Sequence, residues 1–225
     1  MTETTNDSSN PMVTVTETGA SRRGFLTISG VAGLGLLAAA CGSNSTTAGP
    51  ASSSSTNSSR PSGDAGIAKT AASLEVLAVG TYKAALDAAT GGKLGAVPPA
   101  VATFVQTAMA HHQMALDSWN GILTSAGAQK VSTPPTDLKA TVDAAFAKVT
   151  DVTGAAKLAL LLEQTAADTY LVSLPLIMNK DAVTLAGALQ SVDQEHSAIL
   201  LYVLGQYPVP DVFQKGDKAY AGTGS

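Results

Sequence analysis

The feature that most constrains the fold of this 225-residue chain is a polar pattern that occurs twice inside apolar segments. The segment LEVLAVGTYKAAL places Glu75 seven residues before Tyr82, and LEQTAADTYLVSL places Glu163 seven residues before Tyr170. Glu163 follows Glu75 by 88 residues. A carboxylate on a buried face is costly unless a partner compensates its charge. The two copies therefore have to expose these groups or bring them together.

Two histidines repeat at almost the same distance. MAHHQMAL contains His112 and SVDQEHSAIL contains His196, 84 residues later. After Cys41, the sequence contains no other histidine than His111, and no glutamate beyond the repeated pair except Glu195. This distribution indicates two copies of one helical hairpin, with the titratable groups concentrated in matching positions.

Helix-breaking residues divide residues 65–207 into four long helical segments. Alanine, leucine and valine dominate, and no strand-like alternation persists, which favours an all-α fold. The first predicted helix is residues 65–90, which stops at Gly91, and the second starts after Pro98 and Pro99 and ends near residue 127. The third is residues 154–178, with Pro175 as a kink or stop near its end, and the fourth is residues 181–205, capped by Asp181. The long connection between the second and third helices contains a short extra helix, LKATVDAAFAKV. Short, long and short connections are typical of a four-helix bundle with one crossover.

The fourth predicted helix carries its histidine on its apolar stripe. At about 100° per residue, His196 lies at the centre of the stripe and Asp193 at its inner edge, whereas Glu195 lies about 100° away, at the rim. The apolar residues that share the stripe are Leu185, Leu189, Val192, Ile199, Leu200 and Val203. Asp193 and His196 are i, i+3 neighbours that can point at one place.

The second predicted helix repeats this arrangement. His112 lies at the centre of its stripe, and His111 takes the rim position that Glu195 has in the fourth helix. Met109 takes the position of Asp193. The two imidazoles and the two glutamates are therefore expected to meet at mid-bundle, with Met109 facing the place of a missing carboxylate.

This set of inward groups resembles the ferritin-like superfamily. Its metal-binding members take one Glu from each of two helices and a Glu-x-x-His from each of the other two. The resemblance covers residues 65–205 and is strongest to exported ferritin-like domain proteins with a twin-arginine or lipoprotein signal. It implies an all-α, ferritin-like four-helix bundle with a long crossover between the second and third helices.

The resemblance also implies a metal site. Its ligands would be Glu75, His112, Glu163, Asp193 and His196, with His111 and Glu195 as further candidates. Asp193 stands where a Glu is usual, and Met109 stands where the other Glu is expected, although a thioether cannot replace a hard oxygen ligand. Such a set could hold iron or manganese, as one ion or an asymmetric pair. It leaves open whether the protein is an enzyme.

A second interpretation needs no metal. The same five groups could form a buried hydrogen-bonded cluster in which charged imidazoles pair with carboxylates. The bundle would then be a non-catalytic structural or interaction module at the cell envelope. In both interpretations Tyr82 and Tyr170 are expected to be core side chains that lend a hydroxyl to a carboxylate.

The N-terminal 41 residues have the pattern of an export signal. Arg22 and Arg23 precede an uncharged apolar run of about 16 residues, which is short for a membrane span of about 20. Small residues then precede Cys41. The stretch resembles a twin-arginine signal with a lipoprotein cleavage site, which implies a lipid anchor on Cys41 at the outer face of the cell membrane. An uncleaved N-terminal anchor is the alternative.

Composition indicates the remaining segments of the chain and excludes some classes of function. The Ser- and Thr-rich residues 42–65 are interpreted as a tether, residues 66–207 as the bundle, and residues 208–225 as a C-terminal tail. A net charge of −4 without a basic block gives no basis for nucleic-acid binding. A single cysteine excludes an intrachain disulfide. Partner proteins and a homodimer stay open.

Overall fold

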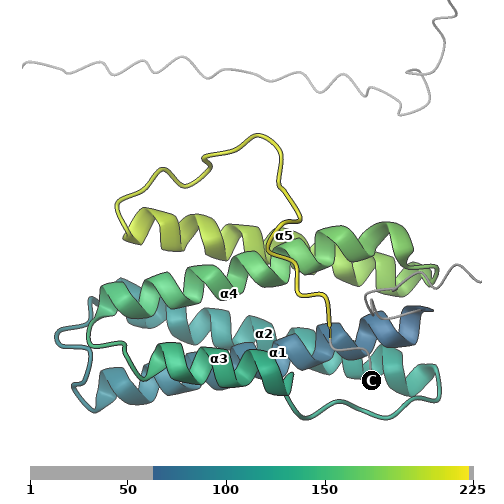
Figure 1. The fold of residues 1–225 in the computed structure, drawn as a ribbon, viewed down its shortest axis with the longest axis horizontal. Coiled ribbons are helices and arrows are strands. Elements are labelled where there is room, and N and C mark those ends of the chain that lie inside the picture. The colour runs from purple at the N-terminus through teal and green to yellow at the C-terminus, as the bar shows by residue number, and fades with distance from the viewer. Residues whose placement is uncertain (1–62, 223–225) are drawn as a thin grey trace, which may run out of the picture. The chain divides into compact units, whose positions relative to one another are not determined.

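The computed structural model describes residues 63–222, and these form helices without strands (Figure 1). The helices are α1 (Gly63–Thr90), α2 (Pro99–Ser125), α3 (Thr136–Phe146), α4 (Val152–Ser173) and α5 (Lys180–Val203), with a 3-10 turn, η1 (Leu174–Leu176), after α4. The predicted all-α bundle with one crossover and one short extra helix is confirmed. The predicted signal, Cys41 and tether lie outside the described residues.

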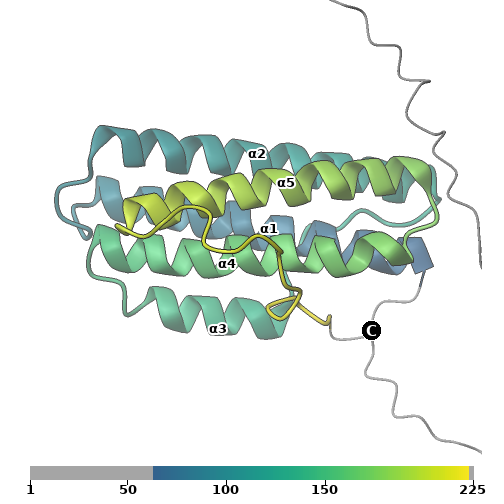
Figure 2. The same cartoon turned by 90° about the horizontal axis from the view of Figure 1, so that it is seen from above.

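Two helical hairpins, α1–α2 and α4–α5, build the bundle, and α3 lies alongside α4 outside the four long helices (Figure 2). At one end, both carboxylate oxygens of Asp64 accept backbone N–H groups, from Met178 at 2.9 Å and from Asn179 at 2.7 Å. The start of α1 therefore lies against the α4–α5 connection, and the end of α1 lies at the opposite end of the bundle. None of the described helices has the length and apolar character that crossing a membrane requires.

The third long helix ends earlier than predicted. α4 stops at Ser173 instead of near residue 178, and η1 follows directly. Pro175 contributes to this, because it has no N–H to donate to the α-helical hydrogen-bond ladder, and the helical backbone of Leu174 continues into the 3-10 turn. The short helix α3 also differs from its prediction, since it begins at Thr136 and ends at Phe146.

The cap of the fourth long helix differs as well. The Asn179 side chain accepts the N–H of Ala182 at 2.9 Å, so Asn179 and not Asp181 caps α5. Asparagine and aspartate are comparable caps. Asp181 instead lies in the first turn, where its negative charge is favourable towards the helix dipole.

The second helices of the two hairpins end in the same way but at different lengths. Gly127 after α2 and Gly205 after α5 each have a φ of +71°, which closes a left-handed C-terminal turn. Relative to its histidine, however, α5 ends six residues earlier than α2. Ile199 and Val203, predicted on the buried stripe, are 44% and 40% exposed, so this part of the prediction is wrong.

The C-terminal segment after α5 returns across the bundle and lies against α4 (Figure 1). Buried Asp168 accepts hydrogen bonds from Gln214 Nε2 at 2.9 Å and from the backbone N–H of Lys218 at 3.0 Å. A Cβ on Gly216 would collide with the Val172 side chain, so the close approach needs a glycine there. The predicted tail is thus packed on the α4–α5 hairpin over the described residues.

Candidate metal centre

The repeated polar residues meet in the middle of the bundle, one group or pair from each long helix. α1 supplies Glu75, α2 His112, α4 Glu163, and α5 both Asp193 and His196. Their exposed fractions lie between 1% and 4%. The helical periodicity explains this placement, because each residue lies on the apolar stripe of its own helix. The structure therefore brings together all five residues that the sequence predicted as ligands.

His112 joins the two glutamates. Its Nδ1 lies 2.7 Å from Glu75 Oε2, and its Nε2 lies 3.1 Å from Glu163 Oε1. Both ring nitrogens face ionisable carboxylates, an arrangement that suits an imidazolium donating to each side. Burial alone would lower the His112 pKa, but the charges of Glu163 and Glu75 outweigh it and raise the pKa well above its usual value.

Glu163 is the most connected group of the cluster. Besides His112, it accepts a hydrogen bond from Tyr82, and its Oε2 lies 3.2 Å from His196 Nδ1. Burial raises a carboxyl pKa, yet the charge of His112 and the imidazole hydrogen bonds dominate and lower the Glu163 pKa to about 2. Glu163 is therefore a carboxylate at neutral pH.

The two tyrosines cross between the hairpins. Tyr82 of α1 donates to Glu163 of α4, and Tyr170 of α4 donates to Glu75 of α1. Burial, followed by the adjacent carboxylate charge, raises the pKa of both phenols well above the usual value, so they stay protonated donors. Trp119 Nε1 in turn donates to the Tyr170 hydroxyl at 2.9 Å. The expectation that each tyrosine lends a hydroxyl to a carboxylate is confirmed.

The rim residues behave differently from each other. Glu195 is exposed, as its angle of about 100° from His196 around the helix predicts. His111 is half-buried and lies closer to the cluster than predicted, because its Nδ1 is 3.0 Å from His196 Nε2 and the two rings are stacked. Burial and the neighbouring His196 lower the His111 pKa, so its ring is neutral near pH 7. His111 extends the hydrogen-bonded chain from the buried centre towards the surface.

Asp193 is the incompletely paired member of the cluster. Among the described residues, its Oδ2 and the Oγ of Ser197 are the buried side-chain oxygens without a hydrogen-bond partner. Burial raises the Asp193 pKa well above its usual value, and the charges of Glu75 and Glu163 raise it further. A buried carboxyl oxygen without a partner is unfavourable by about 1–3 kcal/mol. A cation bound here would remove that cost.

Four donors are close enough to share one ion. One ligand atom each from His112, Glu163, Asp193 and His196 lie within 4.8 Å of one another. Two imidazole nitrogens and two carboxylate oxygens are suitable ligands for a divalent transition metal, whose bonds to them are about 2.0–2.2 Å long. Small side-chain movements would bring these atoms to such distances, so the residues fit a single ion.

Glu75 and Met109 lie outside that group of four. Glu75 already accepts hydrogen bonds from His112 and Tyr170 on its two oxygens. A carboxylate on the far nitrogen of a metal-binding imidazole fixes the orientation of the ring, and Glu75 is placed to act in this way on His112. Met109 is half-buried, and whether it faces the cluster stays a prediction.

Sequence reasoning missed three features of the site. It did not identify Ser197, the link from Trp119 to Tyr170, or the contact of His111 with His196. Ser197 and Trp119 follow their histidines by one and seven residues, so the helical periodicity places Trp119 on the stripe but does not show which hydroxyl its indole meets. Those pairings depend on how two helices pack, which one sequence does not determine.

Comparison with known proteins gives one positive result. A family model described as a ferritin-like domain matches residues 63–206, which is more than half of the chain. Searches of the curated proteins and of the solved structures found no match to the chain. The matched range begins with α1 and ends just after α5.

Proposed function

The chain belongs to the ferritin-like domain family, and from that premise we propose that it is an exported, lipid-anchored protein whose buried cluster binds one divalent transition-metal ion. The ligands would be His112, Glu163, Asp193 and His196. Glu75 would orient His112 from the side away from the ion. Iron and manganese fit the mixed nitrogen and oxygen donor set.

The observation that carries this proposal is the unpaired oxygen of Asp193. The cluster around it is otherwise well connected, since Glu75, His112 and Glu163 each make two or more hydrogen bonds. The unpaired oxygen belongs to one of the four donors that lie within 4.8 Å of one another. A cation among these donors would compensate the carboxylates and occupy that oxygen.

A single ion fits better than the two ions of a complete ferritin-like centre. The Glu-x-x-His pair of α2 is incomplete, because Met109 replaces the carboxylate that would hold a second ion. Bound iron or manganese would supply one-electron redox chemistry, which suits a role in metal binding or in protection against oxidative stress. The buried tyrosines hold the carboxylates in place around the ion.

The N-terminus supplies the proposed location. Arg22 and Arg23 would direct export, and Cys41 would carry the lipid that attaches the protein to the outer face of the membrane. We expect Cys41→Ala to release the protein from membranes or to leave the precursor unprocessed, and Arg22→Lys with Arg23→Lys to block export. Membrane fractionation with immunoblotting measures both. Normal processing and retention of the Cys41→Ala variant would contradict the lipid anchor.

The alternative is a structural or interaction module without metal. The hydrogen-bonded chain favours it, because imidazoles and tyrosines already satisfy every oxygen of Glu75 and Glu163. In this case Asp193 stays protonated, which agrees with the upward shift of its pKa from the usual value. The two functions differ in whether metal stabilises the fold.

Thermal unfolding of the full-length chain with and without manganese distinguishes them. A ligand that binds the folded state alone raises stability by about 2.7 kcal/mol at 100 times its Kd. We expect Mn²⁺ to raise the Tm of the wild type and not that of Glu163→Gln. Glu195→Gln is the matched control, because it removes the same charge from an exposed position of the rim. Absence of any metal-dependent shift in the wild type would leave the structural module as the function.

A further inference from the structure

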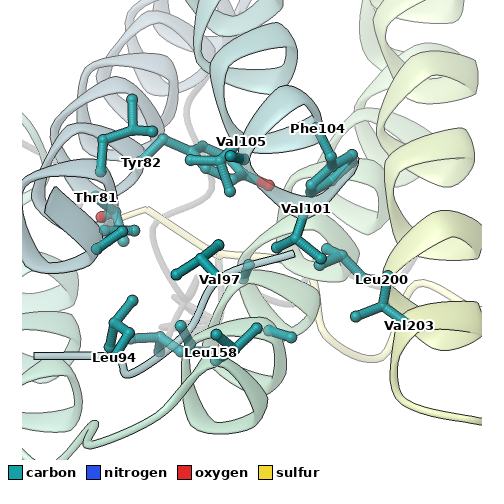
Figure 3. Close-up of a pocket in the computed structure, with 18 of the residues that line it drawn as sticks. Thr81, Tyr82, Leu94, Val97, Val101, Phe104, Val105, Leu158, Leu200 and Val203 are labelled. Carbon is teal, nitrogen blue, oxygen red and sulfur yellow. The ribbon is translucent and has the colours of Figure 1, made fainter. Parts of the chain in front are cut away.

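One end of the bundle contains a cavity that the cluster does not use (Figure 3). The centres of water-sized molecules can occupy about 70 Å³ of this cavity. Parts of α1, α2, α4 and α5 line it. On α1 the lining runs from Thr81 to Ala89, which is about 12 Å along the helix axis. Because this small volume is lined over about 12 Å of α1, the pocket is narrow and elongated.

The pocket presents almost no hydrogen-bonding atoms. Thr81 and Tyr82 are the lining residues with polar side chains, and both hydroxyls are already engaged. Thr81 Oγ1 donates to the carbonyl of Leu77 at 2.8 Å, and Tyr82 donates to Glu163. A buried water needs at least two polar partners, although the volume would hold several waters at roughly 10–15 Å³ each. The space is therefore suited to apolar groups and not to solvent.

The repeat of the hairpin explains why the cavity lies at this end. Trp119 follows His112 by seven residues and is fully buried at the other end, where it stacks on Tyr170 with ring centres 6.0 Å apart. The residue in the same position after His196 is Val203. Val203 is the last residue of α5, lines the pocket and is 40% exposed. A small side chain at the end of a shorter helix leaves the volume unfilled and open to the surface.

The inner end of the pocket is an aromatic wall in front of the cluster. The ring of Tyr82 stacks on His112 with centres 5.6 Å apart, and Phe104 meets His196 edge-on at 5.7 Å. The two rings also contact each other, at 6.3 Å. Both belong to the pocket lining (Figure 3). An occupant would lie one ring away from the imidazoles without touching their nitrogens.

We propose that this pocket binds an aliphatic chain, which enters beside Val203 and ends against the rings of Tyr82 and Phe104. The length and narrowness suit an alkyl chain, and the lack of free polar atoms excludes a polar head group from the interior. The head group stays at the surface, where water solvates it. Burial of the methylene groups supplies the affinity, and the binding does not depend on a metal ion in the cluster.

Titration of the full-length chain with hexanol, octanol and decanol tests the proposal by calorimetry. Each added methylene that enters the pocket tightens binding about fourfold, because its burial contributes about 0.8 kcal/mol. Decanoyl lysophosphatidylcholine, used below its micellar concentration, separates two sources of such a chain. Tighter binding than decanol identifies a membrane lipid, equal binding identifies a free aliphatic molecule, and both results support the pocket.

Two pocket-filling variants with neighbouring controls decide whether the binding occurs here. Val203→Trp places an indole where α2 has Trp119, and Ala85→Leu fills the wall on α1. Each is expected to weaken decanol binding tenfold or more. The controls are Tyr202→Trp, at a residue 74% exposed, and Ala84→Leu, at a half-buried residue outside the lining.

The proposal is overturned if the wild type shows no saturable binding, if affinity does not rise with chain length, or if both filling variants bind like their controls. Failure of the metal proposal would leave these titrations unchanged, because none of the four proposed ligands, His112, Glu163, Asp193 and His196, lines the pocket. Thermal unfolding checks that Val203→Trp and Ala85→Leu are folded.

Discussion

The two hairpins share the positions of a glutamate, a tyrosine and a histidine in the central cluster, and they differ at other positions of their second helices. Both place a glutamate and a tyrosine on the first helix and a histidine on the second, and each tyrosine donates to the glutamate of the other hairpin. Two of the positions at which the second helices differ bear on ligand binding and packing. α2 has Met109 and Trp119 where α5 has Asp193 and Val203.

This difference separates what the fold requires from what a binding site requires. The shared groups form a hydrogen-bonded core that links all four helices, and each half supplies the partners of the other. Asp193 instead adds a carboxyl group without a hydrogen-bond partner for Oδ2, and Val203 leaves a cavity. Both departures from symmetry occur on α5, so this helix carries the features that suit ligands, whereas α2 carries the features that fill space.

Trp119→Val should have the largest effect on stability, because it gives α2 the side chain that α5 has in the same position. Truncating a buried tryptophan leaves a cavity, and we expect a loss of about 3–5 kcal/mol in the free energy of unfolding. The Tyr170 hydroxyl also loses the indole donor. Urea unfolding measures the change, with an unchanged slope as the sign of an intact folded state. A loss below about 1 kcal/mol would mean that this end does not depend on its packing.

Tyr82→Phe and Tyr170→Phe test whether the halves support each other equally. Each change removes a hydroxyl that donates to a buried carboxylate, and a hydrogen bond to a charged group contributes about 1.5–3 kcal/mol. We expect a comparable loss of unfolding free energy in both variants, measured by the same urea experiment. An effect confined to one tyrosine would show that the reciprocal contacts are not equivalent.

Met109→Glu gives α2 a carboxylate in the position where α5 has Asp193. If the cluster binds metal, the completed Glu-x-x-His should tighten Mn²⁺ binding about tenfold or more, equal to about 1.4 kcal/mol. Without metal, the added buried acid should destabilise the fold by about 1–3 kcal/mol. Calorimetric titration and thermal unfolding give the two numbers. Destabilisation that Mn²⁺ does not reverse would favour the metal-free module.

The pH dependence of metal binding follows from His112. Its raised pKa keeps the imidazolium in the metal-free protein, and the stability that this charge contributes is complete below the unfolded pKa and lost as pH rises through the folded pKa. A metal needs the neutral ring, so it must displace the proton. Burial also raises the pKa of Asp193, so a metal bound there must displace a second proton. Mn²⁺ affinity should therefore increase by about tenfold per pH unit for each proton displaced. A pH-independent affinity would mean that His112 is not a ligand.

The sequence predicted the bundle and the five central residues because both depend on helical periodicity. Glu75, His112, Glu163, Asp193 and His196 each lie on an apolar stripe, and stripes meet in the core. The predicted ends of the helices were less accurate, since they depend on local competition, such as that between Asn179 and Asp181 for the cap of α5.

Contacts between helices could not be predicted in the same way. Helical periodicity places His111 at the rim of the apolar stripe. The contact of His111 with His196, however, depends on the rotation and spacing of two packed helices. The cavity depends on the length of α5, which ends six residues sooner after its histidine than α2 does. The hydrogen bonds of the C-terminal segment to Asp168 have no periodic signal.

The metal content of the purified protein decides whether the buried cluster is a metal site. The full-length wild type and its Glu163→Gln variant would be dialysed against Mn²⁺ and analysed by mass spectrometry for bound metal per chain. We predict one ion per wild-type chain and none in the variant, with Glu195→Gln behaving like the wild type. No bound metal in the wild type, or equal occupancy in Glu163→Gln, would contradict the proposed site.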